Sequence, residues 1–242
     1  MEKINFKNKI IMAIGAHPDD NDFGCSATMA LAAKQGAKVI YVVATTGQRG
    51  SRSHHISAEK LSATRVKEQN AAAKILGVKQ VRFLDYRDGE LEPTLKLKEE
   101  IVMLLRQYRP DYVFTMDPSR FYYVRQEHGF INHSDHRAIG EATLDACYPL
   151  ARDLNSFPLH QKMGLKPHKV KEIFLSSFMS DKANCFVDVT KTFGLKLKAL
   201  AAHKSQFDDF RGVKSWMTHG SAELGKHAGY KYAEAFIRLR LR

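Results

Sequence analysis

The chain has 242 residues, of which 44% are hydrophobic and 26% are charged, as in ordinary globular proteins. This composition excludes disordered, collagen-like and low-complexity chains, and no apolar run approaches the roughly 18 residues that a membrane span needs. The formal net charge of +12 admits nucleic acid, anionic lipid or an acidic small molecule as a partner, although a solvated basic surface is the simpler interpretation.

Strand-like and helix-like segments alternate through the first half of the chain. The strands are short apolar runs, and the helices combine helix-forming residues with a closing glycine or an apolar face. We expect strands at 10–16, 39–44, 81–84 and 112–116, and helices at 23–35, 58–76 and 95–108. This alternation predicts an α/β fold with a Rossmann-like, mostly parallel sheet, right-handed crossovers and helices on both faces.

The pattern weakens after the fourth strand. We expect a long irregular segment at 117–136, a helix at about 136–150, strands at 172–175 and 185–189, and a helix at 192–204. No serine- or glycine-rich linker separates this part, so a single domain over residues 1–242 is the better interpretation. From Lys191 onward, eleven Lys/Arg and four Asp/Glu contribute +7 of the net charge.

Two histidine–carboxylate motifs stand at the predicted sheet edge where ligands bind in open α/β folds. Residues 17–20 (HPDD) follow the first strand, and residues 133–136 (HSDH) follow the fourth. Each motif alone is a weak signal, because aspartates and histidines at helix starts are often capping or exposed residues. Two such motifs at one edge of one sheet predict a metal site.

The residue types suit hydrolytic chemistry. A catalytic metal commonly has about three protein ligands and an open position for water, whose pKa it lowers to about 7. A further carboxylate can then accept the proton of that water. Because Asp19 and Asp20 are adjacent in a tight turn, they can point in different directions, so that one binds metal and the other acts as the base.

The two motifs resemble the signatures of the LmbE-like, or PIG-L, family of zinc-dependent N-acetylglucosaminyl deacetylases. Further likeness lies in short segments that follow the family's order: 65–68, 71–72, 76–78, 83–85, 88–91 and 203–206. The resemblance covers about residues 8–207, which would be the core of the domain. Residues 208–242 would form a basic C-terminal extension.

The resemblance implies a Zn²⁺ ion held by His17, Asp20 and His136. It implies that Asp19 is the general base. His133, when protonated, would stabilise the tetrahedral oxyanion beside the substrate carbonyl.

Four further positions enter through the same resemblance. Asp135 would orient a histidine, although a helix cap is an alternative role for it. Arg65 and Asp88 fall where family members contact the sugar. Asn21 departs from the pattern, because many members have an acidic residue there; the change affects local polarity rather than the chemistry.

The expected function is therefore removal of an acetyl group from the amino group of a glucosamine-type sugar conjugate. A basic Rossmann-like module that binds nucleic acid or another anion is an alternative, but it leaves the paired motifs unexplained and lacks a glycine-rich phosphate loop. A non-haem iron(II) oxygenase uses the same ligand types, but it needs dioxygen and usually a cosubstrate. The Asp19 base favours hydrolysis.

The expected partner is a small N-acetylated sugar conjugate whose aglycone the sequence does not identify. We expect no nucleic acid and no membrane span, and the sequence allows a homo-oligomer. The three isolated cysteines, Cys25, Cys147 and Cys185, indicate neither a disulfide framework nor a thiolate zinc site. Together with the lack of a recognisable signal peptide, they favour the reducing cytoplasm.

Overall fold

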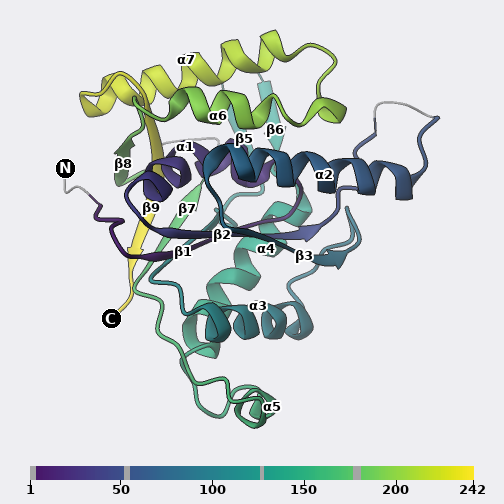
Figure 1. Ribbon diagram of the computed structural model, residues 1–242, viewed down its shortest axis with the longest axis vertical. Coiled ribbons are helices and arrows are strands. Elements are labelled where there is room, and N and C mark those ends of the chain that lie inside the picture. The colour runs from purple at the N-terminus through teal and green to yellow at the C-terminus, as the bar shows by residue number, and fades with distance from the viewer. Residues whose placement is uncertain (1–3, 52–54, 126–127, 177–180) are drawn as a thin grey trace.

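The computed structural model describes residues 4–51, 55–125, 128–176 and 181–242 (Figure 1). Within these ranges the main sheet has seven strands: β1 (Ile10–Gly15), β2 (Lys38–Thr45), β3 (Gln80–Tyr86), β4 (Tyr112–Met116), β7 (Glu172–Ser176), β8 (Cys185–Asp188) and β9 (Ala233–Arg240). Their order is β3-β2-β1-β4-β7-β9-β8. The strands from β3 to β7 pair in parallel, whereas β9 is antiparallel to both of its neighbours.

Helices cover both faces of this sheet. They are α1 (Asp20–Lys34), α2 (Ala58–Leu76), α3 (Leu95–Tyr108), α4 (Ser134–Asp145), α5 (Pro158–Lys162), α6 (Phe193–Leu200) and α7 (Phe210–Ala228), with the short turns η1 (Ala146–Leu150) and η2 (Lys204–Gln206). Figure 1 shows α1, α2, α6 and α7 on one side of the sheet and α3 and α4 on the other. The predicted α/β architecture is confirmed. None of the helices in the described ranges is long and apolar enough to span a bilayer.

The central strands are buried on both faces, which explains their continuous apolar sequences. In β1, Met12 and Ile14 pack in the core shared with α3 and α4. Ile11 and Ala13 point to the opposite core, shared with α1, α2 and α6. The period of two along a strand therefore assigns alternate residues of one apolar run to two separate cores.

The C-terminal segment corrects an expectation from the sequence. Residues 208–242 are not an extension outside the core, because they form α7 and β9, and β9 lies between β7 and β8. Ala233 and Phe236 of β9 are buried. The Arg238 guanidinium, which contributes to the basic appearance of this segment, binds the Glu172 carboxylate of β7 and is thereby neutralised.

Two local expectations are also wrong. The predicted irregular segment 117–136 contains an antiparallel hairpin, β5 (Tyr122–Arg125) with β6 (His128–Ile131), which joins the end of β4 to α4. The predicted helix 136–150 begins earlier and ends at Asp145, before η1. Pro149 has no N–H to donate and cannot continue a regular helix.

The strand order places the two motifs together. The chain moves outward from β1 through β2 to β3 and then returns to β4 on the other side of β1. The carboxyl ends of β1 and β4 therefore form the switch point where ligands bind in open parallel sheets. The first motif joins β1 to α1, and the second begins α4 after β4 and the hairpin.

Candidate metal centre

A tight turn after β1 positions the first motif. Asp19 has a left-handed backbone with φ of 96°, and α1 starts at the next residue. Asp20 accepts hydrogen bonds at Oδ2 from the backbone N–H groups of Ala16 (3.0 Å) and His17 (2.7 Å). Gly15 leaves room for this side chain, because a Cβ at that position would lie 3.0 Å from the Asp20 Cβ, a tight contact. The turn thus presents the Asp20 carboxylate in a fixed orientation.

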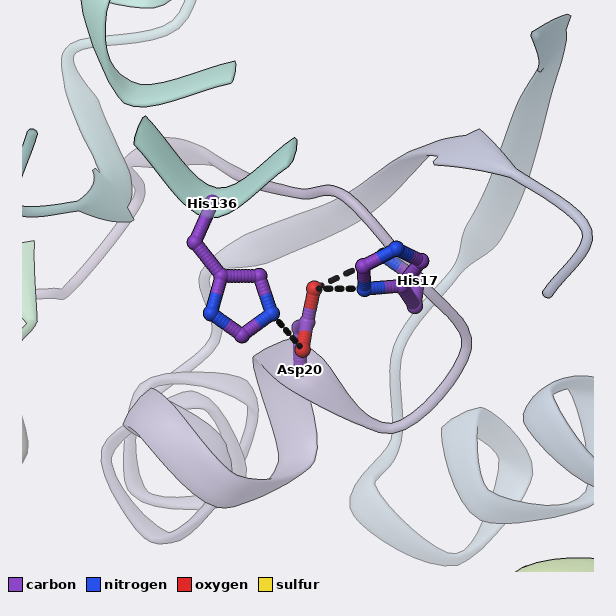
Figure 2. Close-up of side chains that lie close together, drawn as sticks. All are labelled: His17, Asp20 and His136. Atoms are coloured by element: carbon purple, nitrogen blue, oxygen red, sulfur yellow. Dashed lines mark hydrogen bonds and ion pairs between the residues drawn. The ribbon is translucent and has the colours of Figure 1, made fainter. Parts of the chain in front are cut away.

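The side chains of His17, Asp20 and His136 meet at this turn (Figure 2). His136 Nε2 lies 3.1 Å from Asp20 Oδ1, and His17 Nδ1 lies 3.4 Å from Asp20 Oδ2. One potential ligand atom from each residue lies within 4.8 Å of the others. Tetrahedral zinc with bonds of about 2.0–2.2 Å separates its ligand atoms by roughly 3.3 Å. The donor set and its spacing therefore fit a divalent metal ion.

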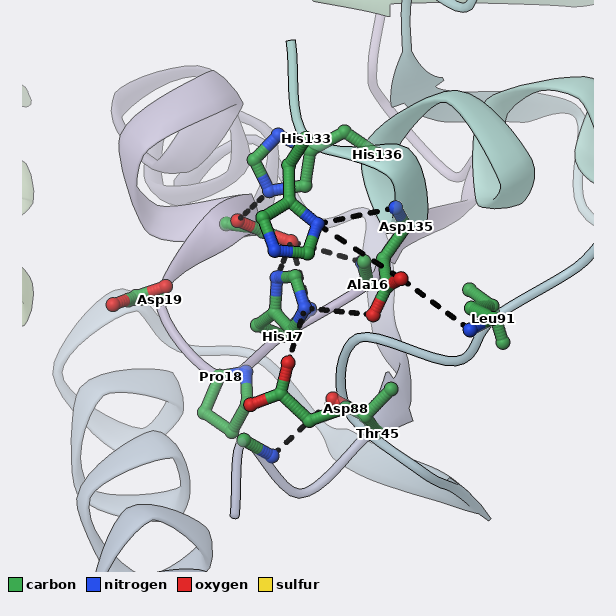
Figure 3. A network of polar contacts seen from close by, with 12 residues as sticks. Ala16, His17, Pro18, Asp19, Thr45, Asp88, Leu91, His133, Asp135 and His136 are labelled. Carbon is green, nitrogen blue, oxygen red and sulfur yellow. Dashed lines mark hydrogen bonds and ion pairs between the residues drawn. The ribbon is translucent and has the colours of Figure 1, made fainter. Parts of the chain in front are cut away.

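The far side of the His17 ring faces two carboxylates (Figure 3). His17 Nε2 lies 3.1 Å from Asp135 Oδ2 and 3.1 Å from Asp88 Oδ1. Asp135 is itself held by the backbone N–H groups of Gly89 (2.7 Å) and Leu91 (3.3 Å). A carboxylate on one ring nitrogen fixes the tautomer and leaves the other nitrogen free to bind metal. This arrangement leaves Nδ1 as the His17 atom that could bind a metal ion.

A second cluster, formed by His17, Asp88 and His133, also has ligand atoms within 4.8 Å of one another. Two of its members have other contacts. The Asp88 carboxylate accepts a hydrogen bond from the Arg49 backbone (3.0 Å), and His133 Nδ1 accepts one from the Asp135 backbone (3.1 Å). The His17, Asp20 and His136 group is therefore the better candidate for a metal site.

The electrostatics of this cluster favour a positive charge. Burial by itself lowers the pKa of His17, but the charge of Asp20 and hydrogen bonds to Asp135, Asp20 and Asp88 raise it to about 12. Burial alone would raise the pKa of Asp20, but the charges of His136 and His17 hold it well below its usual range. A metal cation would satisfy the same surplus of carboxylate charge.

Asp19 points away from Asp20, toward a different set of groups. Its backbone N–H donates to Gln69 Oε1 (2.9 Å), and its carboxylate lies 3.3 Å from Arg65 Nη2. Burial raises the pKa of Asp19 to about 6, against the opposing charge of Arg65. The two aspartates thus have separate surroundings, which separate roles require.

The two expected sugar contacts are buried against the protein. Arg65 donates to two backbone carbonyls and to the Asp19 carboxylate, and Asp88 contacts His17. Arg65 is 4% exposed and Asp88 is 5% exposed. They support the residues at the metal centre from behind, and a direct contact of either with a sugar stays a prediction.

His133 occupies the exposed side of the centre, beside His17 and His136, with ring centroids 4.8 and 5.3 Å away. Because its Nδ1 accepts the Asp135 backbone N–H, a neutral ring carries its proton on Nε2. Burial and the charges of His17 and His136 lower the pKa of His133. Nε2 of His133 is thus the nitrogen available as a donor on the open side, and the protonated ring that the resemblance implies stays a prediction.

Sequence reasoning missed a buried polar network behind Asp19. Gln69 Nε2 donates to Asp22 (2.9 Å), and the other Asp22 contacts are His203 Nε2 (2.8 Å) and the Tyr41 hydroxyl (3.4 Å). The likeness of residues 203–206 to a family signature was the only sequence signal for His203. No local pattern indicates that Gln69 reaches Asp19.

Residues 12–147, more than half of the chain, match the PIG-L family, described as GlcNAc-PI de-N-acetylase. The chain belongs to the PIG-L family. Diacetylchitobiose deacetylase of Thermococcus kodakarensis is 31% identical to this PIG-L chain over an alignment of 229 residues, which covers 93% of this chain and 81% of the relative. A probable N-acetyl-alpha-D-glucosaminyl L-malate deacetylase 2 of Bacillus cereus is 27% identical, covering 81% of this chain and 83% of the relative.

A solved structure supports the same family assignment. N,N'-diacetylchitobiose deacetylase from Pyrococcus horikoshii, in complex with an inhibitor, superposes on this PIG-L chain with a TM-score of 0.86 and 31% identity. The match covers 96% of this chain and 84% of that one. This PIG-L protein is accordingly an N-deacetylase, a hydrolase that acts on an N-acetyl amide.

Proposed function

We propose that this enzyme removes the acetyl group from the 2-amino group of N-acetylglucosamine in a small conjugate, with Zn²⁺ bound by His17, Asp20 and His136. The convergence of these three side chains at the switch point carries the proposal. When bound, the metal would supply a Lewis acid that polarises the acetamide carbonyl and lowers the pKa of water.

The surrounding residues transfer the proton and stabilise the developing negative charge. Asp19 accepts the proton of the attacking water and returns it to the departing amine, and Arg65 orients the Asp19 carboxylate from 3.3 Å. His133 donates from Nε2 to the oxygen of the acetamide as negative charge develops there. These roles agree with the open side of His133 and the buried position of Arg65.

Asp135 and Asp88 act through His17 rather than on the substrate. Both contact His17 Nε2, and Asp135 is anchored to two backbone N–H groups. They hold the imidazole with Nδ1 toward the metal and increase its basicity as a ligand.

The named relatives act on diacetylchitobiose or on N-acetylglucosaminyl malate, so we infer a substrate that contains N-acetylglucosamine. A cytoplasmic location belongs to the same proposal. It is supported by Cys25 and Cys147, which are buried thiols outside any disulfide, as reducing conditions allow.

Metal content and acetate release test the proposal together. We expect about one zinc per chain in the purified protein, and acetate release from N-acetylglucosamine conjugates that a chelator abolishes. His17→Ala and His136→Ala should each lose most of the metal. His168→Gln is the matched control, because His168 contacts Pro110 O (2.8 Å) at the opposite end of β4. Full zinc occupancy in both alanine variants would refute the ligand assignment.

A further inference from the structure

A cavity of about 640 Å³ begins beside Asp20 and extends under α7. Its walls come from the start of α1, the carboxyl ends of β4 and β7, the strands β8 and β9, and α7. The volume is within the range of about 300–1,000 Å³ that is usual for small-molecule sites. Because Asp20 belongs to both, the cavity adjoins the metal centre.

One face of α7 forms the outer wall. Trp216, His219, Glu223 and His227 line the cavity, spaced three or four residues apart as neighbours on one side of a helix are. The Trp216 ring lies 6.1 Å from that of Phe23 on α1, so two aromatic rings stand together at the α1–α7 side. Aromatic surface with a few polar groups is typical of sites that bind small molecules.

The charge of the lining contrasts with the charge of the chain. Lys196, the one lysine among the described lining residues, is buried and lies 2.6 Å from Glu234, so its charge is neutralised. Asp181 of the lining pairs with Arg120. Asp117 and Glu223 have no cationic partner within the described ranges. A protein of net charge +12 therefore has a cavity whose uncompensated charge, apart from the metal ligand, is negative.

We propose that this cavity binds the unit attached to N-acetylglucosamine, and that it accepts an uncharged sugar in preference to an anionic aglycone such as malate or a phosphate ester. The inference rests on the proposed function, since the acetamide at the metal centre would direct the rest of the substrate past Asp20. Trp216 and Phe23 would pack on the sugar, and its hydroxyl groups would donate to Asp117 and Glu223. A carboxylate or phosphate in the same place would be repelled by both.

Trp216 is the only tryptophan of the chain, so its fluorescence reports directly on the cavity. We suggest titrating the zinc-loaded Asp19→Asn variant, chosen to slow hydrolysis, with N,N'-diacetylchitobiose and with N-acetylglucosaminyl malate. The disaccharide should change the emission saturably, with an affinity about tenfold higher than that of the malate conjugate. Equal affinities, or no emission change with the disaccharide, would overturn the proposal.

Substitutions on α7 then test which residues cause the preference for the disaccharide. Trp216→Ala should lower kcat/KM for the disaccharide by about tenfold more than kcat/KM for the N-acetylglucosamine monomer. Glu223→Gln should reduce the ratio of the affinity for the disaccharide to the affinity for the malate conjugate. Lys226→Ala is the matched control, because Lys226 is an exposed α7 residue outside the cavity lining. This variant should change neither the kcat/KM ratio of disaccharide to monomer nor the affinity ratio of disaccharide to malate conjugate.

The two proposals fail in different ways. If no conjugate releases acetate while the emission titration behaves as expected, the proposed reaction on N-acetylglucosamine conjugates is wrong and the sugar-binding cavity stands. If acetate is released but Trp216→Ala lowers kcat/KM equally for the monomer and the disaccharide, the subsite is wrong and the deacetylase function stands.

Discussion

Asp19 and Asp20 illustrate how one turn gives two adjacent carboxylates different surroundings. The left-handed backbone of Asp19 directs its side chain to Arg65, whereas the first turn of α1 directs Asp20 to His17 and His136. Such a backbone conformation is unfavourable for a residue other than glycine, and it persists only where the surroundings stabilise it. The hydrogen bond from Asp19 N–H to Gln69 supplies part of that stabilisation.

The amide variants of the two aspartates should fail in different ways. Asp19→Asn keeps the shape but cannot accept a proton, so the variant should keep its zinc and lose roughly 10²- to 10⁴-fold in kcat. Asp20→Asn removes an anionic ligand, so zinc affinity should fall and added zinc should restore part of the rate. Metal analysis beside acetate-release assays checks both. A zinc-replete Asp19→Asn enzyme with the wild-type rate would disprove the base assignment.

Gln69 should act as a positioning residue for Asp19. Gln69→Leu removes the acceptor of the Asp19 N–H, so we expect kcat to fall by more than tenfold with zinc content preserved and little change in KM. Asn70→Ala is the control, since the Asn70 side chain is exposed and donates to Val66 O of the same helix. A KM change with unaltered kcat would contradict this role.

At the scale of the elements, the sequence predicted most of the fold where local signals were strong. The apolar runs of β1, β2 and β4 are buried on both faces and can be recognised without knowledge of their partners. The strand β9 could not be recognised in this way, because it has the charged residues Glu234, Arg238 and Arg240 among its apolar ones. Glu234 pairs with Lys196 and Arg238 with Glu172, both from distant segments, and no local pattern shows such pairing.

The same distinction holds for the candidate site. His17, Asp20 and His136 were predictable, because each directly follows a strand or begins a helix at one edge of the sheet. The contact of Asp88 with His17 was not, since it depends on how the chain after β3 approaches the first motif. Position after a strand predicts which edge a residue occupies, but not which neighbour it touches.

Arg238 provides a prediction for the added strand. Its guanidinium makes two hydrogen bonds to the Glu172 carboxylate of β7, and both side chains are mostly buried. Arg238→Glu should therefore lower the free energy of unfolding by about 3 kcal/mol. Arg242→Glu, at an exposed position beyond β9, should change it by less than about 0.5 kcal/mol. Urea denaturation measures both, and partial rescue by Glu172→Arg in the Arg238→Glu background would identify the pair.

Over the whole molecule, the Asp22 network connects parts of the chain that are far apart in sequence. Asp22 lies on α1, Gln69 on α2, and His203 follows α6. All three side chains are buried on the side of the sheet that α6 and α7 cover. His203, which precedes α7 and β9 in the chain, therefore connects this segment to α1, the helix that begins at the candidate metal centre.

This connection should make stability depend on pH. Burial by itself lowers the pKa of His203, but the hydrogen bond to Asp22 and the Asp22 charge raise it overall. The folded protein therefore binds this proton more tightly than the unfolded chain, whose histidine pKa is about 6.5. The stabilisation is fully present below about pH 6.5 and is lost as the pH rises through the folded pKa. The difference in unfolding free energy between wild type and His203→Gln should accordingly shrink from pH 6 to pH 9.

His168 is the control with the opposite sign. Burial lowers the pKa of His168, so its proton is bound less tightly in the folded protein than in the unfolded chain. The difference in unfolding free energy between wild type and His168→Gln should therefore grow as the pH rises from 5 to 7 and then level off. Urea denaturation across this range measures both series. If the His203 difference stayed constant from pH 6 to pH 9, the pair would hold the helices together as neutral or permanently charged groups, and its proton would not be linked to folding.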